Sequence, residues 1–482
     1  MYDVLVVGGG PAGVVAALRC GELGAKVALV ERERMGGTCT NDGCVPTRVL
    51  ARTARLMRDS QQFFKYGLIS ESPVLDFSSL LKRTQQVVYS IHEKKQLIKH
   101  LQNSGVDVYS EAGPAQFIDT HTISLNGNGN LYAEKFILCV GGHARQLEFP
   151  GAEHTITHSE VWSLKSAPQS VVILGASATG CQLASILSAF GCKVFLFDRA
   201  TRILTSEDEQ VSEAIADSFM HRGIEITTDI TEVDRIEKDN GYLVFNYTHN
   251  NQSERIIADQ VVLAAGWTGN LEGLNLEAAN VVSERGFIKV DDYLCTSSEN
   301  IYAAGDITGR MMLVQSGGYE GRIAAENAVL GPAQPYKHQI VPHGGFTDPE
   351  YGSVGLTEKQ VKNAGIEYVK SVVSYATLDR AVIDDHTEGF CKLIVSLENH
   401  RILGAHIVGE QALEIVQMVA AGMTTNMWIE QFAELELAYP TYTAIVGLAA
   451  RQLVQQLGVM PLTPQWRALG LTHTAEWEHS EP

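Results

Sequence analysis

The chain has 482 residues, of which 45% are hydrophobic and 19% are charged. This length predicts about three domains, because single domains usually contain roughly 100–200 residues. The formal net charge of −19 repels polyphosphate backbones and anionic membrane surfaces, which argues against nucleic-acid and membrane partners.

The N-terminal residues 2–7 predict a buried strand that runs directly into a glycine turn. No basic leader or cleavage site precedes the strand, and no stretch of the chain reaches the ~18 apolar residues of a membrane span. We therefore expect a cytoplasmic protein. In a reducing compartment a close pair of cysteines is expected to be catalytic or metal-binding rather than structural.

A strand–glycine turn–helix unit at residues 2–31 carries the pattern of a dinucleotide-binding fold. Gly8 permits the tight turn, Gly10 lets a pyrophosphate approach the backbone, and Gly13 allows close helix packing. Glu31, at the end of the next strand, is placed to accept a hydrogen bond from a ribose hydroxyl, while the helix N-terminus holds phosphate.

The segment at residues 36–48 contains two cysteines, Cys39 and Cys44, directly after Gly37 and Thr38. An offset of five does not align side chains on a regular helix, so we expect a distorted first turn that lets the sulfurs meet. A position near a helix N-terminus stabilises a thiolate. A zinc site would need two further ligands, and none is evident; a structural bridge is the other alternative. The six remaining cysteines are expected to be small buried hydrophobes: Cys20, Cys139, Cys181, Cys192, Cys295 and Cys391.

The rest of the chain predicts a second unit and a third domain. Helical patterns occupy about 50–104, a second strand–glycine turn–helix unit occupies 171–198, and strand and helix patterns return near 300–306 and 311–330. The fold class is therefore α/β, with two Rossmann-like nucleotide-binding domains plus a C-terminal α+β domain suited to oligomerisation. The expected divisions are 1–150 and 272–340 for the first domain, 151–271 for the second, 341–460 for the third and 461–482 for a polar tail containing Trp466 and Trp477.

These motifs together resemble the class I pyridine nucleotide–disulfide oxidoreductases, the family of dihydrolipoamide dehydrogenase, glutathione reductase and mercuric reductase. The resemblance rests on the segments 36–48, 301–306, 346–350, 353–357 and 401–409. It implies a homodimer that binds FAD, with Asp306 holding the ribityl chain. It also implies that Cys44 is the charge-transfer thiolate beside the flavin and that Cys39 is the interchange thiol.

The second glycine turn departs from the pattern. Gly175 and Gly180 are present, but Ser177 stands where a second glycine would allow the closest approach of phosphate. Asp198 ends the following strand, where an acid accepts from the adenosine ribose and repels a 2′-phosphate, so we expect NAD(H) in preference to NADP(H). The neighbouring Arg199 and Arg202 weaken this preference. The alternative is a domain that keeps its fold and binds nicotinamide poorly.

Two further departures concern the active site that the resemblance implies. The family's lysine after the cysteine motif is Arg48 here, and the glutamate that usually pairs with it is Gln182, which we interpret as one coupled change. Tyr439 and Ala444 replace the histidine and glutamate of the C-terminal acid–base dyad that serves the partner subunit. Since tyrosine titrates near 10, protonation of a departing thiolate is expected to be impaired near neutral pH.

The sequence thus predicts an FAD-dependent oxidoreductase that passes electrons from a nicotinamide cofactor through Cys39 and Cys44 to a disulfide, on a small molecule or a protein, or to a soft electrophile. A non-catalytic redox sensor or electron carrier with another donor, and a diaphorase or transhydrogenase, remain alternatives. No resident metal is expected. Beyond the catalytic candidates Cys39, Cys44, Arg48 and Tyr439, the candidate cofactor contacts are Gly8, Gly10, Gly13, Glu31, Gly37, Thr38, Gly141, Gly175, Gly180, Gln182, Asp198, Gly266, Gly305 and Asp306.

Overall fold

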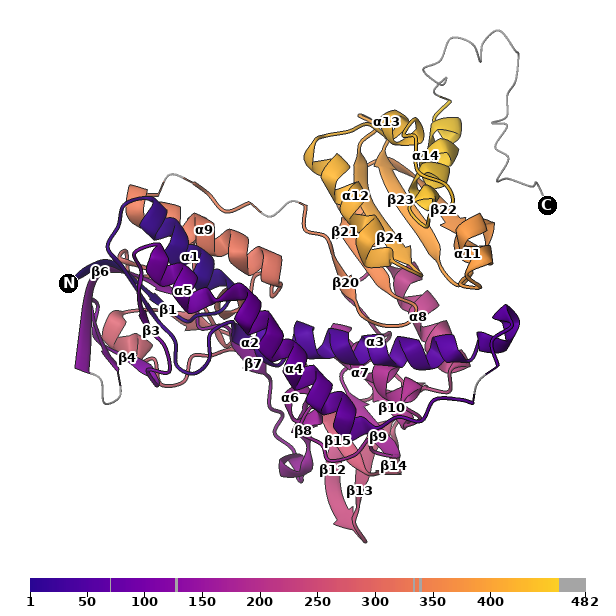
Figure 1. Cartoon of the computed structure of the whole chain (residues 1–482), viewed down its shortest axis with the longest axis horizontal. Helices are drawn as coiled ribbons and strands as arrows, with labels where there is room; N and C mark the ends of the chain where they lie inside the picture. Colours follow the sequence, from indigo (N-terminus) through magenta and orange to yellow (C-terminus); the bar gives the residue numbers. More distant parts are fainter. Residues whose placement is uncertain (70, 126–128, 333, 338–339, 459–482) are drawn as a thin grey trace.

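The computed structural model describes residues 1–69, 71–125, 129–332, 334–337 and 340–458. Two nucleotide-binding sheets and a C-terminal α+β domain make up these residues, which confirms the expected fold class (Figure 1). The predicted tail with Trp466 and Trp477 lies outside the described residues.

The first sheet has seven strands in the order β3-β2-β1-β6-β5-β4, with β19 paired to β6. Strand β19 therefore adds residues near 300 to a sheet that begins at residue 2. Helices α1 and α9 pack so closely that a Cβ at Gly321 would lie 2.2 Å from the Ala12 carbonyl oxygen. The elements are β1 (Tyr2–Val7), α1 (Pro11–Glu22), β2 (Val27–Val30), α5 (Leu97–Asn103), β3 (Asp107–Tyr109), β4 (Ala115–Asp119), β5 (Thr122–Leu125), β6 (Gly129–Leu138), β19 (Ile301–Ala303) and α9 (Val314–Leu330).

The second sheet is parallel throughout, in the order β11-β10-β9-β15-β8, and a three-stranded antiparallel sheet, β12-β13-β14, packs beside it. Strand β9 is buried on both faces, as expected for a covered parallel sheet. The elements are β8 (Ile156–Thr157), α6 (His158–Val161), β9 (Ser170–Leu174), α7 (Ala178–Ala189), β10 (Lys193–Phe197), α8 (Glu209–His221), β11 (Glu225–Thr227), β12 (Glu232–Asp239), β13 (Tyr242–His249), β14 (Gln252–Ala258) and β15 (Gln260–Leu263).

Short elements join the two sheets, and long helices cross between the domains. Strand β7 pairs with β16 where the chain passes from one sheet to the other and back. Helix α3 packs on α4 and α7 and runs across the centre of the molecule (Figure 1). The elements are α2 (Gly37–Asn41), α3 (Cys44–Ser60), α4 (Phe77–Lys95), β7 (Gly142–Ala144), β16 (Trp267–Gly269), β17 (Ser283–Glu284), β18 (Phe287–Ile288) and the 3₁₀ helices at 63–66, 152–154, 276–279, 306–308 and 375–377.

The C-terminal domain is an antiparallel sheet in the order β20-β21-β24-β23-β22, with helices α12 and α14 packed on it. Its core is apolar and almost fully buried. The elements are β20 (His343–Gly345), β21 (Tyr351–Gly355), α10 (Glu358–Asn363), β22 (Tyr368–Ser374), α11 (Asp379–Ile383), β23 (Phe390–Ser396), β24 (Ile402–Val408), α12 (Ala412–Thr424), α13 (Ile429–Ala433) and α14 (Ala444–Gln456).

A seam of ion pairs ties the C-terminal domain to the other two domains. Asp348 lies 2.6 Å from Arg58 of α3, 3.8 Å from Arg55 of α3 and 3.7 Å from Arg222 after α8. Burial opposes ionisation of Asp348, but the three guanidinium charges outweigh it and hold its pKa below the ordinary value. A single carboxylate thus contacts cations from two domains.

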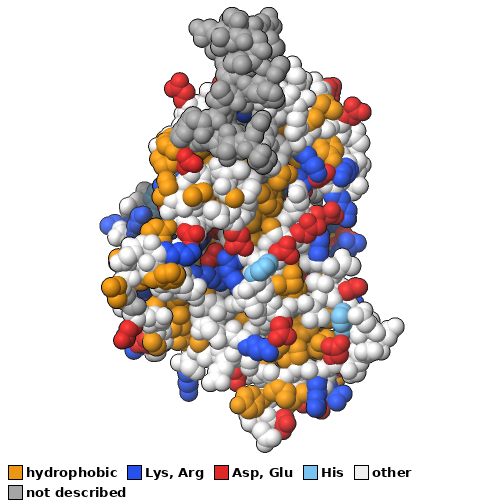
Figure 2. All heavy atoms as spheres, turned by 90° about the vertical axis from the view of Figure 1, so that its right-hand side faces the viewer, with side chains coloured by type: hydrophobic (Ala, Val, Ile, Leu, Met, Phe, Trp, Pro, Cys, Tyr) orange, Lys and Arg blue, Asp and Glu red, His pale blue; other side chains and the backbone are white. Residues whose placement is uncertain are grey.

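Exposed apolar side chains gather near the C-terminal end of α3 and on α11. Phe64 is 74% exposed, and Val382 and Ile383 are 59% and 55% exposed. Figure 2 views the side of the molecule at the right of Figure 1 and shows hydrophobic side chains in several areas among charged ones. Exposed groups of this kind mark interaction surfaces when they are contiguous.

Of the helices in the described part of the chain, none combines the length and the apolar character that crossing a bilayer requires.

The Asp348 seam predicts a stability change. Asp348→Asn leaves Arg55 and Arg58 of α3 and Arg222 after α8 without their shared anion. It should lower the free energy of unfolding by roughly 2 kcal/mol, less than for a fully buried pair because the site is partly exposed. Since the pKa of Asp348 is lowered, its contribution is present above the unfolded pKa and is lost as pH falls through the folded pKa. Thermal unfolding at pH 7 measures the difference.

The matched control is Glu388→Gln, because Glu388 is 48% exposed at its side chain and pairs with the same Arg222. Exposed pairs contribute less than about 1 kcal/mol. Equal destabilisation by the two variants would contradict the assigned importance of Asp348.

Candidate functional site

The first glycine turn has the geometry of a nucleotide-binding loop. Gly8 has φ +107°, and a Cβ there would lie 2.3 Å from the Cys139 carbonyl oxygen. A Cβ at Gly13 would lie 1.8 Å from the Gly8 carbonyl oxygen, so α1 approaches the turn as closely as only glycine permits. Gly10 precedes the helix, and its backbone touches Gly37, where a Cβ would lie 2.9 Å from the Gly10 Cα.

The second glycine turn repeats this geometry. Gly175 also has φ +107°, and a Cβ at Gly180 would lie 1.8 Å from the Gly175 carbonyl oxygen. Ser177 has φ −82° and ψ −170°, close to the −75° and −176° of Gly10. Serine therefore fits this backbone without strain, and its only cost is the side chain itself at the position a phosphate approaches.

The acids that follow the second strand of each unit hold the two turns in the same way. Glu31 accepts hydrogen bonds from the N–H of Gly9 at 2.7 Å and of Glu33 at 2.9 Å. Asp198 accepts from the N–H of Ala176 at 2.6 Å and of Ala200 at 2.8 Å. Each carboxylate therefore lies directly beside its glycine turn.

Helices α2 and α3 are separated at Gly43 and bring the two cysteines together. Cys39 lies in the five-residue α2, and Cys44 is the first residue of α3. The expected distortion is thus a break between two helices, and Gly43 fits there because a Cβ would lie 3.0 Å from the Thr38 carbonyl oxygen. Cys44 at the helix N-terminus agrees with the expected stabilisation of its thiolate.

The two sulfurs are free thiols that differ in acidity. The Cys39 thiol donates a hydrogen bond to Cys44, which lowers the pKa of Cys44 to about 7 and raises the pKa of Cys39. Cys44 is exposed as a residue, but the partial desolvation of its sulfur and the nearby charge of Asp306 oppose this lowering in part. The pair therefore favours a thiolate at Cys44 and a protonated thiol at Cys39.

Asp306 lies at the end of β19, close to this pair. Burial raises the pKa of its carboxyl, and no group in the described ranges donates a hydrogen bond to it. The preceding Gly305 donates its N–H to Glu320 at 2.6 Å. A partly buried carboxylate without a donor, beside a glycine turn and a thiolate, fits a ligand that brings hydroxyl groups, as the ribityl chain of FAD does.

Glu320 was missed by the sequence reasoning. It is fully buried on α9, accepts from Tyr336 at 2.7 Å as well as from Gly305, and burial raises its pKa to about 7. The available signal was a single acid on a helix face otherwise made of Ser316, Gly317 and other small residues.

Gly141 and Gly266 lie where the chain passes between the two sheets. Gly141 precedes β7 and accepts from the N–H of Asn270 at 3.1 Å, and Gly266 precedes β16 and accepts from the N–H of Arg145 at 2.9 Å. Since β7 and β16 pair with each other, the two glycines meet at one crossing.

Arg48 and Gln182 contact the same loop rather than each other. Arg48 pairs with Glu350 at 2.5 Å, and its guanidinium lies 4.7 Å from the ring centroid of Phe346. Gln182 accepts from the Phe346 N–H at 3.1 Å and donates to Ala178 at 2.9 Å. The ion-pair partner of Arg48 is therefore Glu350. The interpretation of Arg48 and Gln182 as one coupled change did not indicate this partner.

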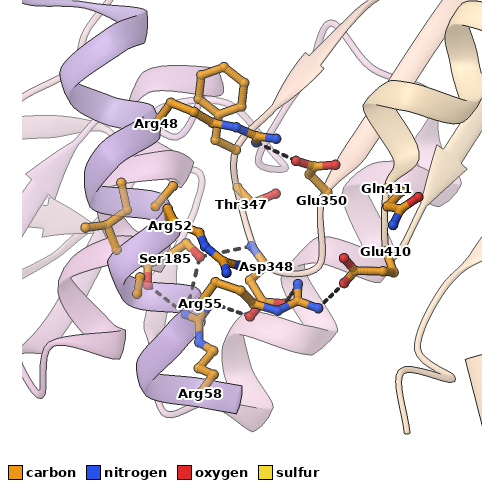
Figure 3. Close-up of a pocket in the computed structure, with 14 residues that line it drawn as sticks. Arg48, Arg52, Arg55, Arg58, Ser185, Thr347, Asp348, Glu350, Glu410 and Gln411 are labelled. Atoms are coloured by element: carbon orange, nitrogen blue, oxygen red, sulfur yellow. Dashed lines mark hydrogen bonds and ion pairs between the residues drawn. The ribbon is translucent and has the colours of Figure 1, made fainter. Parts of the chain in front are cut away.

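Arg48 also lines a pocket that lies between α3 and the C-terminal domain (Figure 3). Besides the Arg48–Glu350 pair, Arg55 bonds Glu410 across the pocket. The walls are thus joined by ion pairs, and the remaining lining residues are Ala51, Arg52, Ala54, Arg58, Ser185, Ile186, Phe346, Thr347, Asp348 and Gln411.

Tyr439 lies at the other end of α3 from Cys44. Its hydroxyl donates to Asp379 of α11 at 2.5 Å, and Asp385, just after α11, pairs with Lys65, just after α3. The 17 residues of α3 span about 25 Å. Tyr439 is therefore far from the cysteines of its own chain, and Ala444 at the start of α14 is buried.

Five of the six other cysteines are buried, as expected, whereas Cys295 is only half-buried. Cys295 precedes β19 at the edge of the first domain, where its backbone bridges to Tyr302.

Comparison with known proteins gives one consistent result. Residues 2–321 match the pyridine nucleotide-disulphide oxidoreductase family, and residues 341–450 match its dimerisation domain. The chain is 33% identical to a mercuric reductase of Staphylococcus aureus over 93% of this chain and 82% of that protein. It is 30% identical to a dihydrolipoyl dehydrogenase of Bacillus subtilis over 93% of this chain and 97% of that protein.

Among solved structures, the Cu(II) complex of the HOCl-induced flavoprotein disulfide reductase RclA from Escherichia coli is similar with a TM-score of 0.83 and 26% identity, covering 94% of this chain and 99% of that chain.

The thiol hydrogen bond predicts how Cys44 titrates. In reduced protein, Cys39→Ala removes the donor, so the pKa of Cys44 should rise from about 7 toward the ordinary 9.0. The pH dependence of Cys44 alkylation by iodoacetamide, located by mass spectrometry, measures this. Cys295→Ala is the control and should leave the profile unchanged; an unaltered profile in Cys39→Ala would refute the donation.

Proposed function

The chain belongs to the pyridine nucleotide-disulphide oxidoreductase family, and from this we propose that it is an NADH-dependent flavoenzyme that reduces acceptors whose leaving group needs no protonation. The observation that carries the proposal is the placement of Cys39 in α2 and Cys44 at the start of α3, side by side at the break between the helices, where the pKa of Cys44 is lowered to about 7. The enzyme class and FAD dependence are those of the family.

FAD would be held by the first glycine turn with Glu31, by Gly37 and Thr38 at the start of α2, and by Gly305 and Asp306. When bound, FAD supplies two-electron transfer between a nicotinamide and the cysteine pair. The residues of the chain then have two tasks: to keep Cys44 ionised and to present Cys39 to the acceptor.

The reduced pair supplies both electrons to a disulfide acceptor. The Cys39 sulfur forms a bond to one acceptor sulfur as its proton passes to solvent and the first acceptor thiolate leaves. The Cys44 thiolate then attacks Cys39, the Cys39–Cys44 bond forms, and the second acceptor thiolate leaves. Two acceptor thiolates and one proton are released, and the pair is oxidised by two electrons.

The residues at the positions of the family's acid–base dyad, Tyr439 and Ala444, support acceptors whose leaving group needs no proton. Tyr439 and Asp379 form a phenol–carboxylate pair, and Ala444 offers no acid. Without an imidazole near neutral pH, a strongly basic thiolate leaves slowly, whereas a weakly basic thiolate or a metal ion needs no proton. The similar RclA structure is a complex with Cu(II), and we therefore include a metal ion among the candidate acceptors.

We propose that the enzyme is a homodimer in which Tyr439 and Asp379 approach the cysteines of the partner. The chain contains the family's dimerisation domain, and the apolar side chains of Phe64, Val382 and Ile383 are exposed on the described single chain. The separation along α3 supports a contribution across subunits, since Tyr439 is remote from its own Cys44.

The expected preference for NADH over NADPH rests on Asp198 and on the hydrogen bonds that the nearby arginines make. Arg202 donates to the carbonyls of Leu204, Thr205 and Glu207, each at 3.0 Å, so its guanidinium is committed to its own loop. Of these two arginines, Arg199 is the exposed one. The carboxylate of Asp198 would repel a 2′-phosphate there.

We expect NADH to reduce the flavin at least about 10-fold more efficiently than NADPH, a difference of ~1.4 kcal/mol, and Asp198→Ser to narrow that ratio. Stopped-flow reduction with each nucleotide measures it. The control is Arg202→Lys, which should leave the ratio unchanged. Inertness of the wild type to both nucleotides would favour a redox sensor or carrier with another donor.

We expect dithiobis(nitrobenzoate), which releases a weakly basic thiolate, to be reduced with a kcat/KM at least about 10-fold above that for lipoamide. Tyr439→His, which places an imidazole beside Asp379, should raise lipoamide turnover and leave the aromatic disulfide nearly unaffected. Steady-state assays with both disulfides, Hg(II) and Cu(II) provide the comparison.

The cysteine variants decide between this function and a diaphorase. Replacing Cys39 and Cys44 by serine should abolish disulfide reduction. If the double variant turned over these acceptors at the wild-type rate, the electrons would bypass the pair and the diaphorase or transhydrogenase alternative would hold.

A further inference from the structure

The C-terminal end of α4 places basic side chains around α2, the helix that carries Cys39. The ammonium of Lys95 lies 3.5 Å from the Thr40 hydroxyl, and His92 lies 2.8 Å from the side-chain oxygen of Asn41. Thr40 and Asn41 directly follow Cys39 in the chain. Asn41 in turn donates to the backbone carbonyls of Arg34 and Met35, at 3.4 and 3.2 Å, so the segment before α2 joins the group.

Arg34, His92 and Lys95, here called the cationic rim, are close enough to act on one another. Burial lowers the pKa of His92, and the positive charges of Arg34 and Lys95 lower it further, so that near pH 7 His92 is neutral and Arg34 and Lys95 carry the charge of the rim. Lys95 also opposes the rise in the pKa of Cys39. The positive charge of the rim thus extends to the interchange thiol.

The cationic rim carries no compensating anion. In the described ranges no carboxylate lies within ion-pair distance of Arg34, His92 or Lys95, although Arg32, two residues before Arg34, pairs with Glu33 at 3.1 Å. The chain has a net charge of −19, so an uncompensated positive cluster next to a reactive sulfur stands out from the general surface. Arg34 and Lys95 are exposed and Cys39 is half-buried, which leaves the rim open to a solute that reaches Cys39.

We propose that the cationic rim selects acceptor disulfides that carry carboxylates beside the sulfur–sulfur bond. This inference rests on the proposed function, because it names the class of acceptor that meets Cys39. An anionic disulfide approaches the rim with favourable Coulomb energy, and Lys95 meets its carboxylate while Cys39 attacks the near sulfur. The exchange itself follows the balance of atoms and electrons given above.

The alternative role for Lys95 is to act on Cys39 alone. A cation that only stabilises the interchange thiolate changes the reaction with every disulfide by the same factor, whatever the charge of that disulfide. A cation that also meets the acceptor changes the reaction with an anionic disulfide more than with a neutral one. The two roles therefore separate in a comparison of probes.

The test uses FAD-loaded full-length enzyme and two aromatic disulfides that both release weakly basic thiolates. Dithiobis(nitrobenzoate) carries one carboxylate on each half, and dithiodipyridine is uncharged. At about 20 mM ionic strength, where the Debye length exceeds ~20 Å, Lys95→Glu should lower kcat/KM for the anionic probe about 10-fold and for the neutral probe less than about 2-fold. The difference should fade near 0.5 M salt.

Lys82→Gln is the matched control, because Lys82 is exposed on the same helix and lies about 20 Å from Lys95 along it. It should leave the preference between the probes unchanged. Flavin content and the rate of flavin reduction by NADH should be the same in all variants.

Equal losses with both probes in Lys95→Glu would overturn the selection of anionic acceptors and leave Lys95 acting on Cys39. Salt-independent, equal turnover of the two probes by the wild type would overturn it as well, with disulfide reduction itself intact. A wild type that reduces neither probe would instead overturn the proposed function on which the inference rests.

Discussion

The charged seam between α3 and the C-terminal domain is the constraint on which the arrangement of the molecule depends. Helix α3 begins at Cys44, the residue proposed to carry the reactive thiolate, and its arginines meet Asp348, Glu350 and Glu410 on the C-terminal domain. One rigid element therefore positions a reactive sulfur and docks a domain. Because buried ion pairs gain little over apolar packing yet cost much when broken, the seam fixes relative domain position more than it adds stability.

The two dinucleotide folds show how far a local pattern determines local geometry. Both turns have the same φ at the first glycine and the same close approach of the helix. In both, the acid after the second strand, Glu31 or Asp198, accepts a hydrogen bond from the backbone of the turn. The sequence indicated these features because they depend on residues within about 30 positions of one another. Serine at Ser177 left the backbone unchanged, since that position is extended and asks for no left-handed conformation.

Two features that sequence reasoning did not reach depend on contacts between distant segments. Glu350 is the partner of Arg48 although 302 positions separate them, and the position of Lys95 beside α2 depends on how α4 folds back. Glu320 was missed for another reason: its one signal is an acid among small residues on a helix face, and no motif spacing relates it to Gly305, from which it accepts a hydrogen bond. The helix break at Gly43 was expected only as a distortion, since the offset of the cysteines does not specify how the chain bends.

Glu320 gives the loop after β19 a dependence on protons. Burial raises the pKa of this carboxyl to about 7, so the folded chain holds the proton more tightly than the unfolded chain does. The contribution of Glu320 to stability is fully present below its unfolded pKa and is lost as pH rises through about 7. Because the same carboxyl accepts from the N–H of Gly305, the backbone that presents Asp306 faces a neutral acid on one side of neutrality and an ion on the other. The loop proposed to bind the flavin's hydroxyl groups thus rests on a buried carboxyl that gains or loses a proton near neutral pH, independently of the two thiols.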